Sequence, residues 1–158
     1  MADVHVLRPA RLRAEPAIAL ALLFGQILFG ALTAGLRAGY AFSSWPLMGN
    51  ELFPAATPLT DPLWHNLFAN PIVVQFAHRW WAFVAAAGLM MLAARARRAG
   101  AGRMGAVLIA LICAQIVLGI ATLLGGVEIV VAVAHQANAA LLVIAATAAA
   151  HAVGRRTG

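Results

Sequence analysis

Residues Gln75–Trp81 read Gln-Phe-Ala-His-Arg-Trp-Trp and place an imidazole, His78, a few residues inside a long apolar segment. A titratable side chain is costly in such a segment, so a histidine there is expected to meet a partner. In a membrane-spanning helix, a polar residue of this kind is by default a functional-site hypothesis. The first question that this stretch raises is therefore which group His78 faces.

Four long segments of the chain are nearly free of charge. Of the 158 residues, 63% are hydrophobic and only 10% are charged, which is too apolar for an ordinary soluble domain. Each segment has the roughly 20 residues that a helix needs to cross a ~30 Å hydrocarbon core. Their helix-forming residues favour helices over barrel strands. We therefore predict an all-α, integral-membrane four-helix bundle, with spans at about 17–36, 73–94, 104–124 and 127–152.

Basic residues flank these segments unevenly. Arginines cluster before the first span, between the second and third, and after the fourth, whereas Arg37 and Arg79 lie on the other side. The positive-inside rule then predicts cytoplasmic termini in a bacterial inner (plasma) membrane, with the lipid bilayer as a partner. The remaining parts are a basic arm at 1–16, an outer loop at 37–72 and a tail at 153–158. The net charge of +6 does not indicate a nucleic-acid partner, because no soluble basic face carries it.

The chain contains an internal repeat. Residues 26–33, Gln-Ile-Leu-Phe-Gly-Ala-Leu-Thr, match residues 115–122, Gln-Ile-Val-Leu-Gly-Ile-Ala-Thr, at four positions. In each case the next span carries a histidine that follows an alanine, His78 or His135. The sequence therefore predicts two repeated helix pairs that run in the same direction. Parallel repeats of this kind are related by an axis along the membrane normal.

Such an axis would bring His78 and His135 face to face. Imidazole nitrogens are good axial ligands of haem iron, and haem sites in helix bundles are built from side chains on facing helices. We predict that these two histidines are metal ligands to a haem iron. Gln75 lies one turn before His78 on the same face and is expected to orient the ligand or the macrocycle. Arg79 and Arg37 lie on the outer side, where they can pair with haem propionates.

The residues alone leave two further roles to weigh for the histidine pair. Histidines in a bundle can hydrogen-bond to carbonyls or to Gln and Thr side chains across helices. Zinc is disfavoured, because no third or fourth Cys, His or carboxylate lies at the same depth. The lone Cys113 is interpreted as a packing residue, and His65 and His151 as interfacial side chains.

The loop between the first two spans is long, and long loops inside a compact domain are usually functional or disordered. Its tryptophans and scattered apolar residues argue against disorder. The sequence of residues 61–69 predicts a short interfacial helix, with Thr60 or Asp61 as its cap and Pro62 in its first turn. Its apolar side would consist of Leu63, Trp64, Leu67 and Phe68.

These motifs also resemble the haem A synthase (cytochrome oxidase assembly) family. The resemblance extends from about Phe24 to His151. It rests on Ser-Trp-Pro-Leu-Met at 44–48, on Val-Gln-Phe-Ala-His-Arg at 74–79, on Ala-His-Gln at 134–136, and on residues 30–36, 70–71 and 115–122. Full-length members have eight spans in two pseudo-symmetric halves and oxidise a methyl group of haem O to the formyl group of haem A. This chain resembles the C-terminal half, in which two histidines hold haem b.

The resemblance implies that His78 and His135 bind haem b, with haem O as the substrate. It also implies a second four-span half or a homo-oligomer, and haem O synthase and an electron donor as further partners. The catalytic carboxylate proposed for the family lies three residues before the first histidine of the other half. The resemblance implies an oxidoreductase, but here Gln75 occupies that offset, so this chain by itself lacks the expected carboxylate and no catalytic residue is assigned. The alternatives are a bis-His electron-transfer module without synthase activity and a cofactor-free membrane protein.

Overall fold

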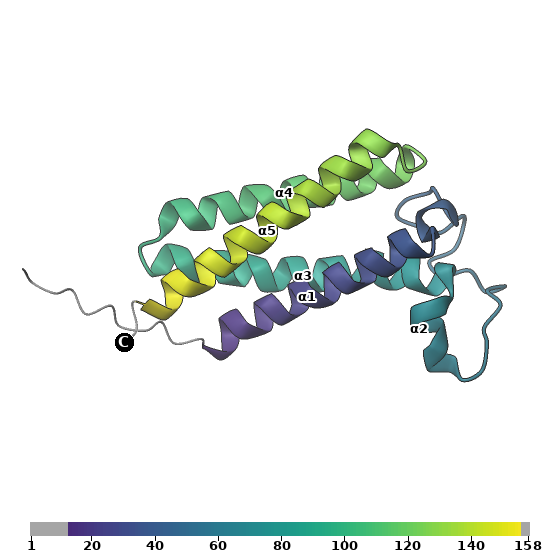
Figure 1. Cartoon of the computed structure of the whole chain (residues 1–158), viewed down its shortest axis with the longest axis horizontal. Helices are drawn as coiled ribbons and strands as arrows, with labels where there is room; N and C mark the ends of the chain where they lie inside the picture. The colour runs from purple at the N-terminus through teal and green to yellow at the C-terminus, as the bar shows by residue number, and fades with distance from the viewer. Residues whose placement is uncertain (1–12, 156–158) are drawn as a thin grey trace, which may run out of the picture.

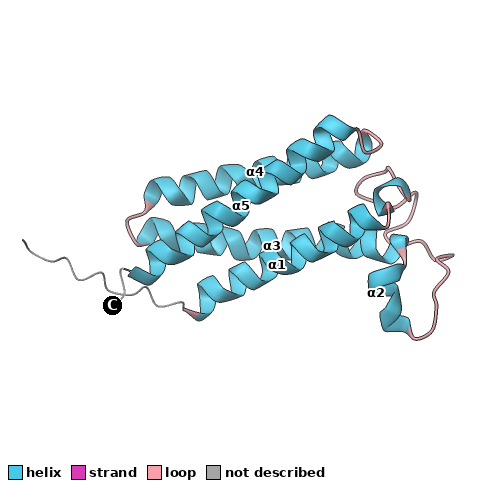
Figure 2. Cartoon of the chain, viewed as in Figure 1, coloured by secondary structure: helices cyan, strands magenta, loops and turns pink. Residues whose placement is uncertain are grey.

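The computed structural model describes residues 13–155, and its regular elements in that range are helices (Figures 1 and 2). Four of them are long and apolar enough to cross a membrane. This confirms the prediction of an all-α integral membrane protein. These helices are α1 (Ala14–Gly35), α3 (Pro71–Arg98), α4 (Gly102–Leu124) and α5 (Ile129–Arg155). Of the predicted arm and tail, residues 1–12 and 156–158 lie outside the described range.

The first residues of α3 show how the sequence starts a span. Asn70 is the N-cap, and its Oδ1 accepts hydrogen bonds from the backbone N–H of Ile72 (3.0 Å) and Val73 (3.4 Å). Pro71 suits the first helical position because its missing N–H would have no intrahelical partner there. The helix ends in a basic turn that complements its dipole, with Arg95, Arg97 and Arg98.

The long helices pack as two antiparallel pairs, α1 against α3 and α4 against α5, and α3 also contacts α4 and α5 (Figure 1). α1 begins and α5 ends at one end of the bundle, which we call the terminal end. The opposite end carries residues 36–70 and the turn at 125–128, and we call it the loop end. The two ends differ in what they bury.

The terminal half of the bundle holds an apolar core in which alanines, among them Ala93, Ala96, Ala146 and Ala149, pack with larger Leu and Ile side chains. Small residues also let the helices approach closely. A Cβ on Gly88 would lie 2.8 Å from Leu22 Cδ1, and a Cβ on Gly105 would lie 2.7 Å from the carbonyl oxygen of Ala93. Side chains fill this half, which leaves the loop half for polar groups.

The loop between α1 and α3 contains three short helical pieces: η1 (Ala38–Tyr40), η2 (Leu63–His65) and α2 (Asn66–Ala69). The last two correspond to the predicted interfacial helix, which is shorter than expected and begins with a 3₁₀ turn. The predicted cap is wrong, because η2 has no side-chain cap. The Thr60 hydroxyl instead donates to Asn66 Oδ1 (3.2 Å), which also accepts the Thr60 backbone N–H (3.1 Å).

Candidate functional site

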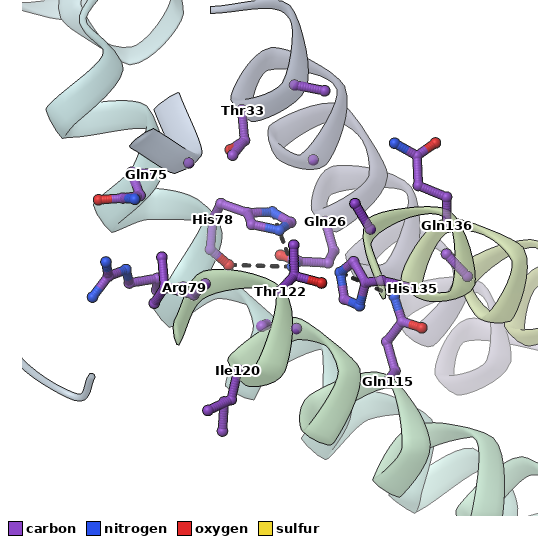
Figure 3. Close-up of a pocket in the computed structure, with 18 of the residues that line it drawn as sticks. Gln26, Thr33, Gln75, His78, Arg79, Gln115, Ile120, Thr122, His135 and Gln136 are labelled. Carbon is purple, nitrogen blue, oxygen red and sulfur yellow. Dashed lines mark hydrogen bonds between the residues drawn. The ribbon is translucent and has the colours of Figure 1, made fainter. Parts of the chain in front are cut away.

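A cavity of about 560 Å³ lies between the four long helices in the loop half of the bundle (Figure 3). Ligand pockets in proteins typically enclose ~300–1,000 Å³ and are mostly apolar with a few converging polar groups. This cavity follows that pattern. The structure brings all five sequence-predicted site residues to its wall: Arg37, Gln75, His78, Arg79 and His135.

His78 is held by a glutamine of the neighbouring helix α1. Gln26 Nε2 lies 3.1 Å from His78 Nδ1 and donates to the backbone carbonyl of His78 at 3.2 Å. Because a carbonyl oxygen can only accept, the nitrogen of the amide faces the ring, and Nδ1 accepts from it. Gln26 Oε1 is buried and has no hydrogen-bond partner.

His135 on α5 meets a glutamine of α4. Gln115 Nε2 lies 3.4 Å from His135 Nε2. The amide of Gln115 is oriented by Asn138, whose Nδ2 donates to Gln115 Oε1 at 2.6 Å and to the carbonyl of Leu111 at 3.0 Å. Since the oxygen of Gln115 is engaged by Asn138, its nitrogen is turned toward the imidazole. His135 Nδ1 is buried without a partner.

Each imidazole also lies directly against a glycine. A Cβ on Gly30 would stand 3.2 Å from Cε1 of His78, and a Cβ on Gly119 would stand 3.0 Å from Cε1 of His135. Contacts this short require the neighbour to move. Both helices therefore use a glycine to let an imidazole lie close to the backbone.

The two helix pairs make corresponding contacts beyond the histidines. Trp81, three residues after His78, donates from Nε1 to the carbonyl of Leu22 at 3.0 Å. Asn138, three residues after His135, donates to the carbonyl of Leu111 at the same distance. Leu22 and Leu111 each precede the glutamine of their helix by four residues. Sequence reasoning missed these two donors, although their equal spacing from the histidines is visible in the sequence.

The threonines of the repeat serve their own helices. Thr33 Oγ1 donates to the carbonyl of Phe29 (2.8 Å), and Thr122 Oγ1 donates to that of Leu118 (2.7 Å). Bonds to the carbonyl four residues earlier are a common way to satisfy a hydroxyl within a helix. The threonines thus line the cavity with their hydroxyl groups already engaged.

Gln75 and Arg79 hold the loop that follows α1. They are 2% and 7% exposed. Arg79 Nη1 donates to the carbonyls of Ser44 (2.9 Å) and Leu47 (3.3 Å), and its Nη2 donates to that of Phe42 (2.9 Å). Gln75 Nε2 donates to the carbonyl of Phe42 at 3.0 Å. Arg79 Nε and Gln75 Oε1 have no hydrogen-bond partner, so each side chain has one polar atom that is not bonded to the loop.

These bonds position residues 42–48, which we call the roof segment, at the loop end of the cavity. Trp45 of this segment lines the cavity and stacks on Trp80 (ring centroids 6.4 Å apart) and Phe83 (6.1 Å). The guanidinium carbon of Arg79 lies 6.0 Å from the Trp45 ring, within cation–π range. Sequence reasoning did not assign this contact, although the three-residue spacing of Trp80 and Phe83 indicates one aromatic face.

Arg37 lies at the mouth of the cavity beside Tyr40 and Val127. Its backbone is left-handed (φ 51°), as is that of Val127 (φ 63°). Left-handed backbone is uncommon for residues other than glycine, and especially for β-branched ones. The cavity mouth is therefore formed by two turns in unusual conformations, one from each helix pair.

The wall of the cavity offers imidazole, amide, hydroxyl and guanidinium groups. No Asp or Glu occurs among the described residues that line it. The two imidazoles come from different helices and point into one space (Figure 3). Arg37 and Trp45 of the roof segment also line this space. This arrangement suits a largely apolar ligand that carries acidic groups and a centre able to bind the two imidazole nitrogens.

Comparison with known proteins identifies relatives over almost the whole chain. Proteins named "Heme A synthase" from Rhizorhabdus wittichii, Sphingopyxis alaskensis and Rhodospirillum centenum are 53%, 42% and 46% identical to it over 144, 149 and 136 residues. These regions cover 91%, 94% and 84% of this chain but only 42%, 42% and 36% of the relatives. The chain thus spans about two fifths of their length. No solved structure matches it significantly.

The family described as cytochrome oxidase assembly protein matches residues 3–147, which is most of the sequence. That range includes both cavity histidines, their glutamines and the roof segment. The resemblance noted from the motifs is confirmed by this match. The chain belongs to the cytochrome oxidase assembly protein family.

Proposed function

We propose that this chain is the haem-binding half of a haem A synthase and holds haem b between His78 and His135. The observation that carries the proposal is the matched environment of the two imidazoles. Each lies in the same cavity, against a glycine and beside a glutamine of the preceding span. The bound haem would supply a redox-active iron, and the protein would supply its ligands and its orientation.

The orphaned polar atoms of the cavity fit this assignment. A histidine that binds iron through Nε2 donates its Nδ1–H to an acceptor, which fixes the tautomer. For His78, a turn of the Gln26 amide would bring Oε1, which now has no partner, to that proton. His135 differs from His78, because the Gln115 amide meets its Nε2 and its buried Nδ1 has no partner. The haem propionates are proposed to meet Arg37 at the mouth and the unpartnered Nε–H donor of Arg79.

The proposed reaction of the complete enzyme is oxidation of the methyl group of haem O to the formyl group of haem A. Proton transfer in such a reaction needs a group that ionises in the working pH range. The Gln75 amide does not, and it is engaged with the roof segment. We therefore assign catalysis to an assembly with a second four-span half or with further copies of the chain. Haem O synthase and an electron donor are the other proposed partners.

One observation favours a second candidate, a bis-His electron-transfer module without synthase activity. No carboxylate occurs among the described residues of the cavity wall. The roof segment argues against this candidate, because a simple electron-transfer anchor has no need of an aromatic cover held by a buried arginine.

The test of haem ligation is spectroscopic. The purified protein should show the spectrum of a low-spin, six-coordinate b-type haem, and His78→Ala and His135→Ala should each abolish it or convert it to high spin. His65→Ala and His151→Ala are matched controls, because both side chains are exposed and outside the cavity. Unchanged spectra in both cavity variants, with folding verified by circular dichroism, would overturn the ligation.

We also infer that both ends of the chain face the cytoplasm, on the basis of the arginine distribution. A reporter that is active only in the periplasm, fused after Gly158, should be inactive. The same reporter inserted in the loop between α1 and α3 should be active. The opposite pair of results would reverse the orientation.

A further inference from the structure

A stretch of the loop between α1 and α3 exposes its apolar side chains and buries a polar one. The exposed fractions of its large apolar residues run from 41% for Leu67 to 66% for Leu63. Asn66, between them in sequence, is only 2% exposed. A water-soluble loop has the opposite pattern, so this surface is expected to meet something apolar. Its apolar members are Leu59, Leu63, Trp64, Leu67 and Phe68.

The buried Asn66 satisfies the backbone of the stretch from inside. Its Nδ2 donates to the carbonyls of Thr60 (2.8 Å) and Leu63 (3.0 Å), and its Oδ1 accepts the Thr60 N–H. Asn70 adds a bond from Nδ2 to the carbonyl of Pro58 at 2.8 Å. Backbone groups that are already paired cost less to bring into a poorly hydrated environment. Transfer of this stretch from water to an apolar environment therefore costs less free energy than for a loop with unpaired backbone groups.

Its position relative to the spans decides which apolar environment it meets. α2 is joined to α3 by Asn70 alone, so it lies at the level where the span ends. In Figure 1, α2 runs crosswise to the four long helices at the loop end and projects beside them. A helix that is crosswise to the spans at their end lies along the membrane surface.

The charge and composition of the stretch fit lipid better than a charged partner. Between Leu59 and Asn70 the only formal charge is Asp61. Tryptophan prefers the interface between the headgroups and the acyl chains. We propose that Leu59–Phe68 is a membrane-surface anchor whose apolar side chains enter the headgroup–acyl boundary at the loop end. This proposal does not depend on haem binding.

The anchor has a consequence for the cavity. The same loop carries the roof segment, and Arg79 and Gln75 hold that segment at the other side of the loop. The loop is thus tied at one side to the bundle and at the other to the lipid surface, which keeps the roof segment over the loop end of the cavity.

The test measures the surroundings of single spin labels on the full chain in lipid nanodiscs. Labels are placed by Trp64→Cys and Leu67→Cys in a Cys113→Ser background, since Cys113 is the only cysteine. Asn50→Cys, exposed elsewhere in the loop, is the water control, and Val117→Cys, exposed inside the apolar span α4, is the lipid control. Collisions with oxygen report lipid, and collisions with a water-soluble nickel chelate report water.

At positions 64 and 67 we expect an oxygen-to-nickel collision ratio several-fold above that at position 50 and approaching that at position 117. A ratio like that of position 50 at both sites would place the stretch in water and overturn the proposal. Protection from both reagents would indicate a protein contact and would also overturn it. Two labelled sites are used so that a local disturbance at one does not decide the result.

Discussion

At the scale of single residues, each cavity histidine is positioned before any ligand arrives. A glycine lets the imidazole lie against the neighbouring helix, and a glutamine of that helix bonds to the ring. Two contacts from one helix leave the ring little freedom, and such preorganisation is what a metal ligand requires. For His135 the arrangement extends one residue further, because Asn138 orients Gln115.

Replacing either cavity glycine by alanine should weaken haem binding. Helix propensity alone favours Ala over Gly by up to about 1 kcal/mol, so it predicts a more stable protein. The close contacts predict the opposite, because a Cβ at Gly30 or Gly119 would displace His78 or His135. Haem content and the low-spin spectrum measure the effect. Gly35→Ala is the control, since a Cβ there meets nothing within 4 Å. Full haem loading in both cavity variants would refute this role of the glycines.

Removal of the Arg79 guanidinium should release the roof segment. A hydrogen bond to a charged group contributes about 1.5–3 kcal/mol, which corresponds to a roughly ten- to hundredfold rise in the open fraction of the segment. Arg79→Met should therefore speed chymotrypsin cleavage within residues 42–48. Arg79→Lys should restore little, because an ammonium lacks the planar fork that reaches several carbonyls.

Arg98→Met is the matched control for this experiment, because Arg98 is exposed at the other end of α3. If Arg79→Met loses haem but its cleavage rate stays unchanged, the guanidinium acts on the cofactor and not on the loop.

At the scale of elements, side chains just before a helix determine where two of the spans begin. Asn70 caps α3, and Glu128 does the same for α5, where its carboxylate accepts the N–H groups of Val130 (3.1 Å) and Val131 (3.0 Å). These hydrogen bonds, first from Val130 and then from Val131, hold the pKa of Glu128 below its usual range. Both caps lie at the loop end, and Glu128 directly follows Val127 at the cavity mouth.

The Glu128 cap should make stability depend on pH in one direction. Because the pKa in the folded protein is lower than in the unfolded chain, the carboxylate stabilises the fold above its unfolded pKa. This contribution is lost as the pH falls through the folded pKa. The melting temperature of Glu128→Gln should lie below that of the parent at neutral pH, and the gap should close in acid. Glu128→Asp, which can still cap, should behave like the parent. A gap that widens in acid would contradict this role.

At the scale of the whole molecule, the bundle is divided along its length. Alanine and larger aliphatic side chains fill the terminal half, and the cavity with its two histidines lies in the loop half. The four spans together form the wall of this cavity. The chain covers about two fifths of the length of the relatives that are named "Heme A synthase". A second half or a second copy is the proposed source of the groups that this wall lacks.

Expressed alone in a strain without its own haem A synthase, the chain should bind haem but accumulate haem O. Haem A is expected only when a four-span partner that carries the carboxylate is co-expressed, because Gln75 cannot act as a general base. Extraction and chromatography of the haems measure the outcome. The chain carrying both His78→Ala and His135→Ala is the control for background synthesis. Haem A made by the chain alone would instead point to a homo-oligomeric enzyme with a different catalytic group.

Much of this molecule follows from its sequence alone. The lengths of the apolar segments predict four spans, because a hydrocarbon core of fixed thickness demands a minimum run of helix. The repeat and the two histidines predict the candidate site, since equal spacing on equivalent helices places equivalent side chains at equal depth. These properties depend on neighbours within a few turns of helix, and such neighbours are read directly from the order of residues.

Only the tertiary structure decided which distant groups meet. Arg79 faces carbonyls of the roof segment more than 30 residues earlier, and Asn66 turns a loop so that its apolar side chains face outward. Neither contact has a periodic signal, because backbone carbonyls occur at every residue and sequence does not mark which of them will approach a donor. The glycine–imidazole contacts are of the same kind: the sequence contains the glycines, but the packing of α1 on α3 and α4 on α5 determines which ring each one touches.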